Sequence, residues 1–523
     1  MDKENKKITL AIGLVTLLII IISAVVFIPK KENEKPHKET EEIIENIPKN
    51  DYKINNNGLE KFDLYFLKQE NENVNKVYSP LSIKYALEML AEGASGETKA
   101  EILSVLGSYK ATKYTNTQNI SLANALFVKD TYKKGINESY SNKINKKYGA
   151  ELIVDPFANP NNINNWVNEK TLNLIPNITN NLNDVDYMLV NALAIDMEWE
   201  KLIHAIIDQY ENNYLHEKSG PVVYPLALNG SYEGSKIKGV SVEFNDKEAE
   251  GLQFAGSVNK YDIVKELGRD KIYEEIKKEY QEWIKDESNI LEESDRDVDK
   301  FVNNFIDELN KNYKHYSLST DFRFNVTDNE KVFAKTLKEY NGTRLEYVAI
   351  MPKKENLNSY IKNVEANHIN DLIKGLKGDK YEDYKEGYVT NITGYLPTFK
   401  FDYKLNLKQD LINLGIKNVF DKDKSELKNM TDDKAYISKV EHKSNIEFSN
   451  EGIKAAASTT LLGGGATSGG FEHIYDVPEI KIDLNFDKPY MFLIRDTKTG
   501  EIWFTGTVYE PNPYTIEKVP VEE

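Results

Sequence analysis

Residues 450–475 read NEGIKAAASTTLLGGGATSGGFEHIY, and they join two kinds of sequence. Residues 453–462 are mostly small or β-compatible and include neither Pro nor Gly, whereas residues 463–470 are rich in glycine, which permits backbone conformations that other residues avoid. The first part alternates, so that one face of a strand would carry Ile453, Ala455, Ala457, Thr459 and Leu461. The stretch is therefore either a flexible surface loop between two strands or a segment with two states, first a loop and later an inserted strand.

Composition limits what the chain does. Its 523 residues are 40% hydrophobic and 29% charged, which is enough for a sizeable core. A net charge of −17 and an isoelectric point near 5.2 argue against nucleic acid as a partner. The absence of cysteine excludes disulfides, thiolate metal sites and a cysteine nucleophile.

The first residues predict a membrane anchor. Residues 8–28 form an uncharged run, and a helix of this length would span about 31 Å, close to the thickness of a bilayer core. We expect residues 1–29 to be an uncleaved signal anchor with the large domain outside the cell; secretion after cleavage of a leader is the alternative. Residues 30–50 are predicted to be a polar tether, and residues 514–523 an acidic tail.

Two apolar segments each contain unexpected polar residues. Ser79 is placed to cap a helix that starts with Pro80 and ends at Gly93, and the hydroxyl of Ser82 lies close to the apolar stripe of that helix. Residues 188–195 form a short apolar run typical of a strand buried on both faces, and Asn191 interrupts it. Because a buried amide or hydroxyl must find hydrogen bonds, these residues predict an internal polar cluster.

The rest of the chain predicts a mixed set of elements. Residues 246–316 are dense in charge and helical in pattern, and we interpret them as a helical insertion with a structural role. His442 lies within a strand pattern at 435–448 and is interpreted as a residue of that sheet. Other patterns predict helices at 163–175 and 405–414, and strands at 345–351, 388–403 with a bend at Pro397, 490–495 and 502–509.

No catalytic motif stands out. The chain lacks a Gly-x-Ser-x-Gly elbow, a phosphate-binding Gly-Lys-Ser/Thr loop and a His-Glu-x-x-His pattern. We therefore assign no catalytic residue, no metal and no cofactor, although Asp, Glu and Ser are numerous enough that a catalytic dyad stays open.

Taken together, the motifs between about residues 57 and 511 resemble those of the serpin family, and we expect a microbial member. The resemblance rests on Ser79-Pro80-Leu81-Ser82-Ile83, on Leu189-Val190-Asn191-Ala192-Leu193 with Trp199, on His442-Lys443 before Glu451-Gly452, and on Pro489-Tyr490-Met491-Phe492. It implies an α+β fold over residues 51–513, with three β-sheets, about nine helices, an exposed reactive-centre loop at about 452–485 and the insertion at about 246–316. It also implies that a polar cluster, the shutter, and a nearby breach contain Ser79, Ser82, Asn164, Asn191, His442 and Trp199.

The resemblance implies suicide inhibition of a protease, in which the cut loop inserts into a β-sheet. The implied hinge of the loop is Gly452, Ile453, Ala455, Ala456 and Ala457. Counting from this hinge puts the scissile bond at Ala466-Thr467, with Gly465 and Leu462 as alternatives. A small residue before the cut favours elastase-like or subtilisin-like serine proteases, and cysteine proteases are also considered. We expect a monomer.

The hinge also departs from the family pattern. Ile453 stands where Thr is usual, and Lys454 stands where Glu is common. These departures keep a second reading open, in which the protein is a non-inhibitory binding or surface module with the same fold.

Overall fold

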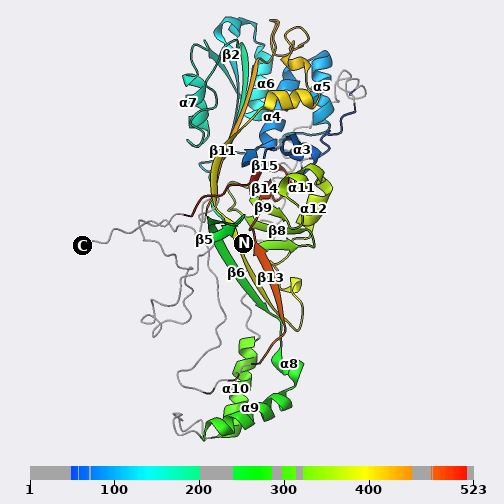
Figure 1. Cartoon of the computed structure of the whole chain (residues 1–523). Helices are drawn as coiled ribbons and strands as arrows, with labels where there is room; N and C mark the ends of the chain where they lie inside the picture. Colours follow the sequence, from blue (N-terminus) through cyan, green and yellow to red (C-terminus); the bar gives the residue numbers. More distant parts are fainter. Residues whose placement is uncertain are drawn as a thin grey trace, which may run out of the picture. The chain divides into compact units, whose positions relative to one another are not determined.

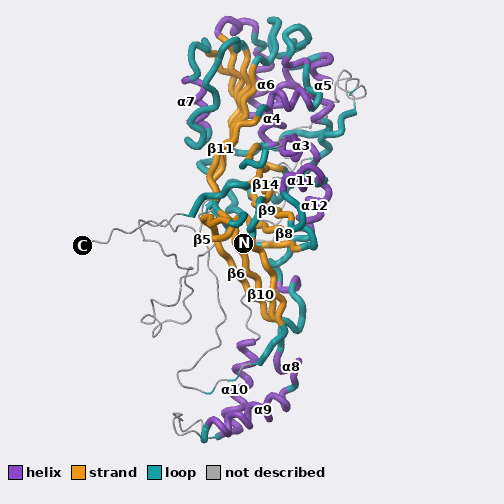
Figure 2. The backbone as a smooth tube through the Cα atoms, in the orientation of Figure 1, coloured by secondary structure: helices purple, strands orange, loops and turns teal. Residues whose placement is uncertain are grey.

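The computed structural model describes residues 47, 49–56, 58–69, 72–200, 240–285, 297–313, 322–449, 471, 473 and 475–514 (Figure 1). Contacts group residues 48–523 into one unit, and every element below belongs to it. The described residues form three β-sheets with helices packed around them, which confirms the predicted α+β fold (Figure 2).

Sheet A has five strands in the order β11-β12-β4-β2-β3. These strands are β11 (Phe399–Leu405), β12 (Lys439–Phe448), β4 (Tyr187–Ile195), β2 (Ile120–Lys129) and β3 (Glu151–Asp155). Helix α7 (Asn161–Lys170) lies on one side of this sheet, and α4 (Pro80–Gly93) and α6 (Glu138–Tyr148) lie on the other (Figure 1). Because both faces are covered, β2 and β4 are nearly continuous apolar runs.

Sheet B has six strands in the order β1-β15-β14-β9-β8-β7. They are β1 (Lys76–Tyr78), β15 (Ile502–Val508), β14 (Tyr490–Asp496), β9 (Leu345–Pro352), β8 (Glu330–Thr336) and β7 (Arg323–Val326). A side chain at Gly506 of β15 would collide with the carbonyl oxygen of Lys76 and with the ring of Phe492, so glycine lets these strands approach closely.

Sheet C has four strands, ordered β13 (Glu479–Asn485), β10 (Val389–Pro397), β6 (Lys247–Asn259) and β5 (Val240–Phe244). The strand pattern predicted at 388–403 is divided at the expected place. β10 ends at Pro397 in sheet C, and β11 starts at Phe399 in sheet A. Proline has no backbone N–H to donate, so the chain can change sheets there.

The first helix of the serpin-like pattern is formed as predicted. Ser79 caps α4, since its Oγ accepts a hydrogen bond from the backbone N–H of Ser82, and Pro80 occupies the first turn. The other helices around the sheets are α3 (Lys61–Gln69), α5 (Gly96–Leu106), α11 (Leu357–Asn363), α12 (Ala366–Lys374) and α13 (Leu407–Asn413).

The predicted helical insertion is shorter than 246–316. Residues 247–259 are strand β6, which pairs with β5 on one side and β10 on the other, so pairing with distant strands decides their structure. The helices of the insertion are α8 (Ile263–Leu267), α9 (Arg269–Trp283) and α10 (Val298–Tyr313). The predicted apolar faces of α9 and α10 do pack together, in a cluster separate from the main core.

A second difference concerns the helix predicted at 163–175. Helix α7 ends at Lys170, and both Leu172 and Asn173 have positive φ angles, of 56° and 61°. An L-residue in the left-handed region cannot continue an α-helix, so the chain turns there.

The predicted membrane anchor at 8–28 lies outside the described residues. Among the described residues, no helix is both long enough and apolar enough to cross a bilayer.

Candidate functional site at the junction of β4 and β12

Sheet A consists of two well-paired halves with a short junction between them. β12 pairs with β11 from His442 to Phe448, and β4 pairs with β2 along its whole length. The two halves meet through parallel pairing of β12 with β4, which covers Lys439, Val440 and Glu441 opposite Met188, Leu189 and Val190. Beyond Glu441 and Val190 both strands continue, but in the described part of the chain they no longer pair with each other.

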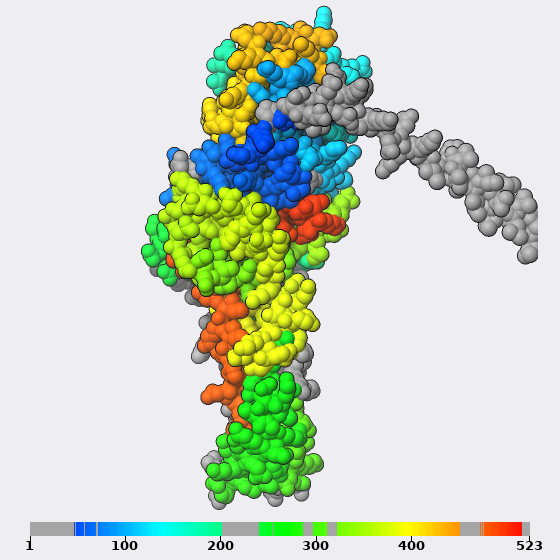
Figure 3. All heavy atoms as spheres, turned by 90° about the vertical axis from the view of Figure 1, so that its right-hand side faces the viewer, coloured from blue at the N-terminus to red at the C-terminus, as the bar shows by residue number. Residues whose placement is uncertain are grey.

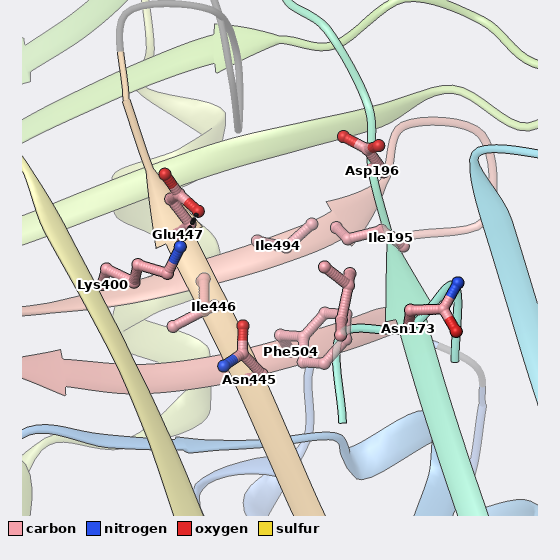
Figure 4. A pocket seen from close by; sticks show the side chains of 10 residues that line it. Asn173, Ile195, Asp196, Lys400, Asn445, Ile446, Glu447, Ile494 and Phe504 are labelled. Carbon is pink, nitrogen blue, oxygen red and sulfur yellow. Dashed lines mark hydrogen bonds and ion pairs between the residues drawn. The ribbon is translucent and has the colours of Figure 1, made fainter. Parts of the chain in front are cut away.

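A cavity of about 200 Å³ lies where β4 and β12 have separated. In Figure 4 its walls are Ile195 on β4 and residues 445–447 on β12, and the side chains of Ile494 and Phe504 from sheet B lie between them. An unpaired strand edge presents free backbone N–H and C=O groups, which makes it a template for another strand. The gap is therefore a candidate site for an added strand.

A polar cluster lies at the point where the pairing stops. Here the backbone N–H of Ser79 donates to Nε2 of His442 over 3.1 Å, and the Ser444 hydroxyl lies 3.3 Å from the same nitrogen. Asn191 donates from its amide to Oδ1 of Asn124, the residue directly opposite on β2. The structure thus brings Ser79, His442 and Asn191 to this junction.

Several atoms of this cluster have no hydrogen-bond partner among the described residues. They are Oγ of Ser82, Nδ1 of His442 and Oδ1 of Asn191, all in side chains that are almost completely buried. Burial lowers the pKa of His442 to about 4, so the imidazole is neutral at pH 7. An unsatisfied buried polar atom costs about 1–3 kcal/mol, so a strand that supplied partners here would stabilise the sheet.

Trp199 marks the other end of the separated region. Its indole Nε1 donates to the carbonyl oxygen of Ser449 over 3.4 Å, and its ring packs edge-on against Phe448, with 5.7 Å between centroids. It is fully buried. The indole therefore holds the last residues of β12 just before the stretch 450–470, which lies outside the described residues together with the predicted hinge and the Ala466-Thr467 bond.

Asn164 does not join the polar cluster. It lies on α7, on the opposite face of sheet A from α4, and its amide contacts the backbone of Ile178 and Thr179. Conversely, the sequence interpretation missed Asn124 and Ser444. A signal existed for both, since Asn124 interrupts an apolar strand as Asn191 does, and Ser444 lies two residues after His442 on the same strand face.

The described part of this junction holds no metal site. Within the described ranges, no three His, Asp or Glu side chains are grouped so that they could hold a metal ion. The chemistry that the junction supports is recognition of a peptide strand.

Comparison with known proteins identifies the family. A family model described as "Serpin (serine protease inhibitor)" matches residues 59–204 and 293–511, which is more than half of the chain. The protein therefore belongs to the serpin family. Strands β5 and β6 and helices α8 and α9 fall between the matched segments; β5 and β6 nevertheless complete sheet C.

Curated relatives cover most of the chain at low identity. Iripin-2 from Ixodes ricinus is 24% identical, covering 83% of this chain and 87% of the relative. Human Serpin B3 is 23% identical, covering 86% and 97%. The leukocyte elastase inhibitor of Xenopus tropicalis is also 23% identical and also covers 86% and 97%.

Solved structures share the fold. The thermophilic serpin Tengpin in its native state aligns with a TM-score of 0.55 at 20% identity, over 89% of this chain and 98% of its own. Thyroxine-binding globulin in complex with thyroxine aligns with a TM-score of 0.54 at 16% identity, over 86% and 98%.

Proposed function

We propose that this serpin inhibits extracellular serine proteases by inserting its cleaved loop between β4 and β12. The observation that carries the proposal is the short junction of sheet A, where two parallel strands separate after Glu441 and Val190. In the sequence, the predicted hinge begins a few residues after Phe448, the last residue of β12.

The direction of the chain fits the gap. A loop that turns back after β12 runs antiparallel to β12, and therefore also antiparallel to β4. Insertion would replace a short parallel contact by two antiparallel ladders, which are the more stable kind per residue. The small residues of the hinge suit entry between β4 and β12, since large side chains would have to displace the packed floor of Ile494 and Phe504.

The covalent step would belong to the protease. Its active-site serine attacks the carbonyl carbon of the bait residue, the peptide bond breaks, and the new amino terminus leaves on Thr467 in the assigned position. The acyl-enzyme would then be carried away by the inserting strand before water can hydrolyse the ester. Ala466 before the cut favours elastase-like or subtilisin-like targets, and the name of the Xenopus relative agrees with an elastase.

The test is direct. The soluble domain is mixed with an elastase-like and a subtilisin-like protease, and the products are separated under denaturing conditions. We expect a covalent complex that resists denaturant and a cut between Ala466 and Thr467. Clean cleavage without any complex, with each protease tried, would contradict the proposal.

Non-inhibitory binding is the second candidate. Ile453 and Lys454 depart from the usual hinge. The solved structure of thyroxine-binding globulin shows that the same fold is found in a protein with a bound small molecule. Cleavage without a gain in thermal stability would favour this candidate, because an inserted strand must stabilise sheet A.

We also propose that residues 8–28 anchor the protein in the membrane. Their length and lack of charge support a spanning helix. The expected result is that the full chain sediments with membranes and requires detergent, but not high salt, for release. Release of the whole population in a form shortened at its amino terminus would instead indicate a cleaved leader.

A further inference from the structure

The residues that follow the proposed bait are held by the helical insertion. We call Phe471, His473 and residues 475–477 the arm, and α9 with α10 the hairpin. Phe471 is 8% exposed and lies among four aromatic rings of the hairpin. The distances from its ring centroid are 5.2 Å to Tyr280, 5.3 Å to Phe305, 6.0 Å to Trp283 and 6.2 Å to Phe301.

Polar contacts extend the attachment along α9. Nδ1 of His473 lies 2.6 Å from Oε2 of Glu279, and the hydroxyl of Tyr475 donates to Oε2 of Glu275 over 3.2 Å. The His473 and Tyr475 rings also meet edge-on at 4.4 Å. Glu275 and Glu279 are one helical turn apart and therefore share a face of α9. The arm thus makes both apolar and polar contacts with the same hairpin.

The arm also forms part of the hydrophobic core of the hairpin. Phe471, Tyr475 and Val477 belong to the apolar cluster that includes Ile272, Tyr280 and Ile306, and Val389 at the start of β10 also packs there. In Figure 3 the orange strand β13, which follows the arm, lies beside yellow β10 and runs away from the green helices. The helices α8 and α9 lie outside the segments that match the family. Helix α10 lies within a matched segment, and both α9 and α10 contact the arm.

We propose that the hairpin anchors the loop, with Phe471, His473 and Tyr475 as positioning residues that fix where the bait ends. The anchor adds to the proposed function, and its effect on loop insertion rests on that function. Because the arm is bound on the hairpin and β13 is paired with β10, an uncut chain has no residues after 470 to feed into sheet A. The anchor would therefore restrain insertion until a protease cuts the bait.

The anchor also limits the position of the target. Phe471 is four positions after Thr467, and an extended chain spans at most about 3.5 Å per position, so the cut end stays within about 14 Å of the arm. A protease bound at Ala466 is then close enough to touch the hairpin.

Cleavage after aromatic residues tests the anchor without any reference to inhibition. A chymotrypsin-like protease would cut after Phe471 and Tyr475 if the arm were free, and mass spectrometry identifies the ends of the fragments. In the parent we expect both bonds to be protected. Phe305→Ala, which removes one ring from around Phe471, is expected to raise their cleavage rate about tenfold by favouring local opening.

Two further variants test whether the polar contacts hold the arm and whether unfolding of the hairpin or a change of charge could explain the result. The double variant Glu275→Gln and Glu279→Gln leaves the aromatic rings in place and is expected to raise cleavage about threefold. Glu274→Gln makes the same kind of substitution once, at an exposed neighbouring position, and should have no effect. Equal cleavage of the parent and Phe305→Ala would overturn the anchor. If Phe305→Ala raises the cleavage rate and the double variant does not, the polar contacts of His473 and Tyr475 are not part of the anchor.

Warming the uncut protein tests the restraint. The parent and Phe471→Ala are held at an elevated temperature without protease, and the remaining trapping capacity is measured over time. Phe471→Ala is expected to lose capacity several times faster. Equal rates would overturn the restraint even if the arm is protected. If neither protein ever traps a protease, the proposed function fails, while the cleavage experiment still decides whether the arm is anchored.

Discussion

Strands β14 and β12 occupy similar central places in two sheets, but they are completed differently. β14 pairs with β15 on one side and with β9 on the other over nearly all of its length. Among the described residues, β12 pairs with β11 from His442 to Phe448 and with β4 only through Lys439–Glu441, so no part of it is paired on both sides. In sheet B the central strand is therefore paired along both edges, whereas sheet A keeps a gap beside a buried polar cluster. The difference shows that one protein can combine a fully paired sheet with an incompletely paired one.

The strongest way to break this comparison is to block the gap. Ala457→Arg places a cation on the face of the inserted strand that would point toward the protein core. Ala456→Arg places it on the opposite face of the same strand. An unpaired buried charge costs about 3 kcal/mol or more, equivalent to about a hundredfold in rate. We expect Ala457→Arg to be cleaved without trapping and Ala456→Arg to trap almost normally. The fraction of protease in covalent complex measures this, and equal trapping by both variants would rule out insertion in this register.

A second prediction concerns a buried cluster of three charged residues beside sheet B. Lys84 of α4 is completely buried and lies 2.7 Å from Asp63 of α3 and 3.0 Å from Glu501, just before β15. Lys84→Met leaves two buried carboxyl groups without their cation and should lower the free energy of unfolding by about 3–5 kcal/mol. Chemical denaturation measures the loss. Lys374→Met, which breaks an exposed pair with Asp371, should change stability by less than about 0.5 kcal/mol. Similar losses for both would show that the buried triad has no special role.

The polar cluster predicts a pH dependence. His442 has a folded pKa of about 4, below its ordinary value of 6.5, so the unfolded chain binds a proton in this range that the folded chain does not. The stability linked to neutral His442 is complete above pH 6.5 and is lost as the pH falls to 4, by about 3 kcal/mol. His442→Gln should remove this slope.

The difference between parent and variant is the quantity to measure. Burial raises the pKa of Glu501 to about 7, and this group titrates in the same range with the opposite sign. Unfolding curves for both proteins at several pH values isolate the His442 contribution. A constant difference between parent and His442→Gln from pH 7 to pH 4 would contradict the assignment.

The smallest expected effect is at the open end of the gap. Trp199→Phe keeps an aromatic ring against Phe448 but removes the hydrogen bond from Nε1 to Ser449. We expect a loss of about 1 kcal/mol in stability, measured by thermal unfolding. Because this contact holds the end of β12, the variant should also trap protease slightly faster. Slower trapping would show that the indole assists insertion rather than restraining it.

Local patterns predicted much of the fold because each was supported by its own neighbours. Ser79 and Pro80 started α4, the apolar run at 188–195 formed β4, and Pro397 divided β10 from β11. The polar residues Ser79, Asn191 and His442 were also recognised, since a polar group inside an apolar pattern needs a partner.

Other features were misread where distant partners decide the structure. Residues 247–259 were included in the charge-dense block 246–316 that predicted helices, but hydrogen bonds to β5 and β10 make them a strand. Asn164 was grouped with the polar cluster, but α7 lies on the other face of sheet A. Neither outcome is encoded within a few residues of the segment concerned.

By itself, the sequence determined the family motifs, the alternation of the loop and the presence of buried polar residues. Only the tertiary structure decided where β4 and β12 separate, which polar atoms stay unpaired at that point, and that Phe471 packs into the helical insertion. The physical reason is that periodicity and capping act over a few residues. Strand register and ring packing, in contrast, join segments that are far apart in the chain.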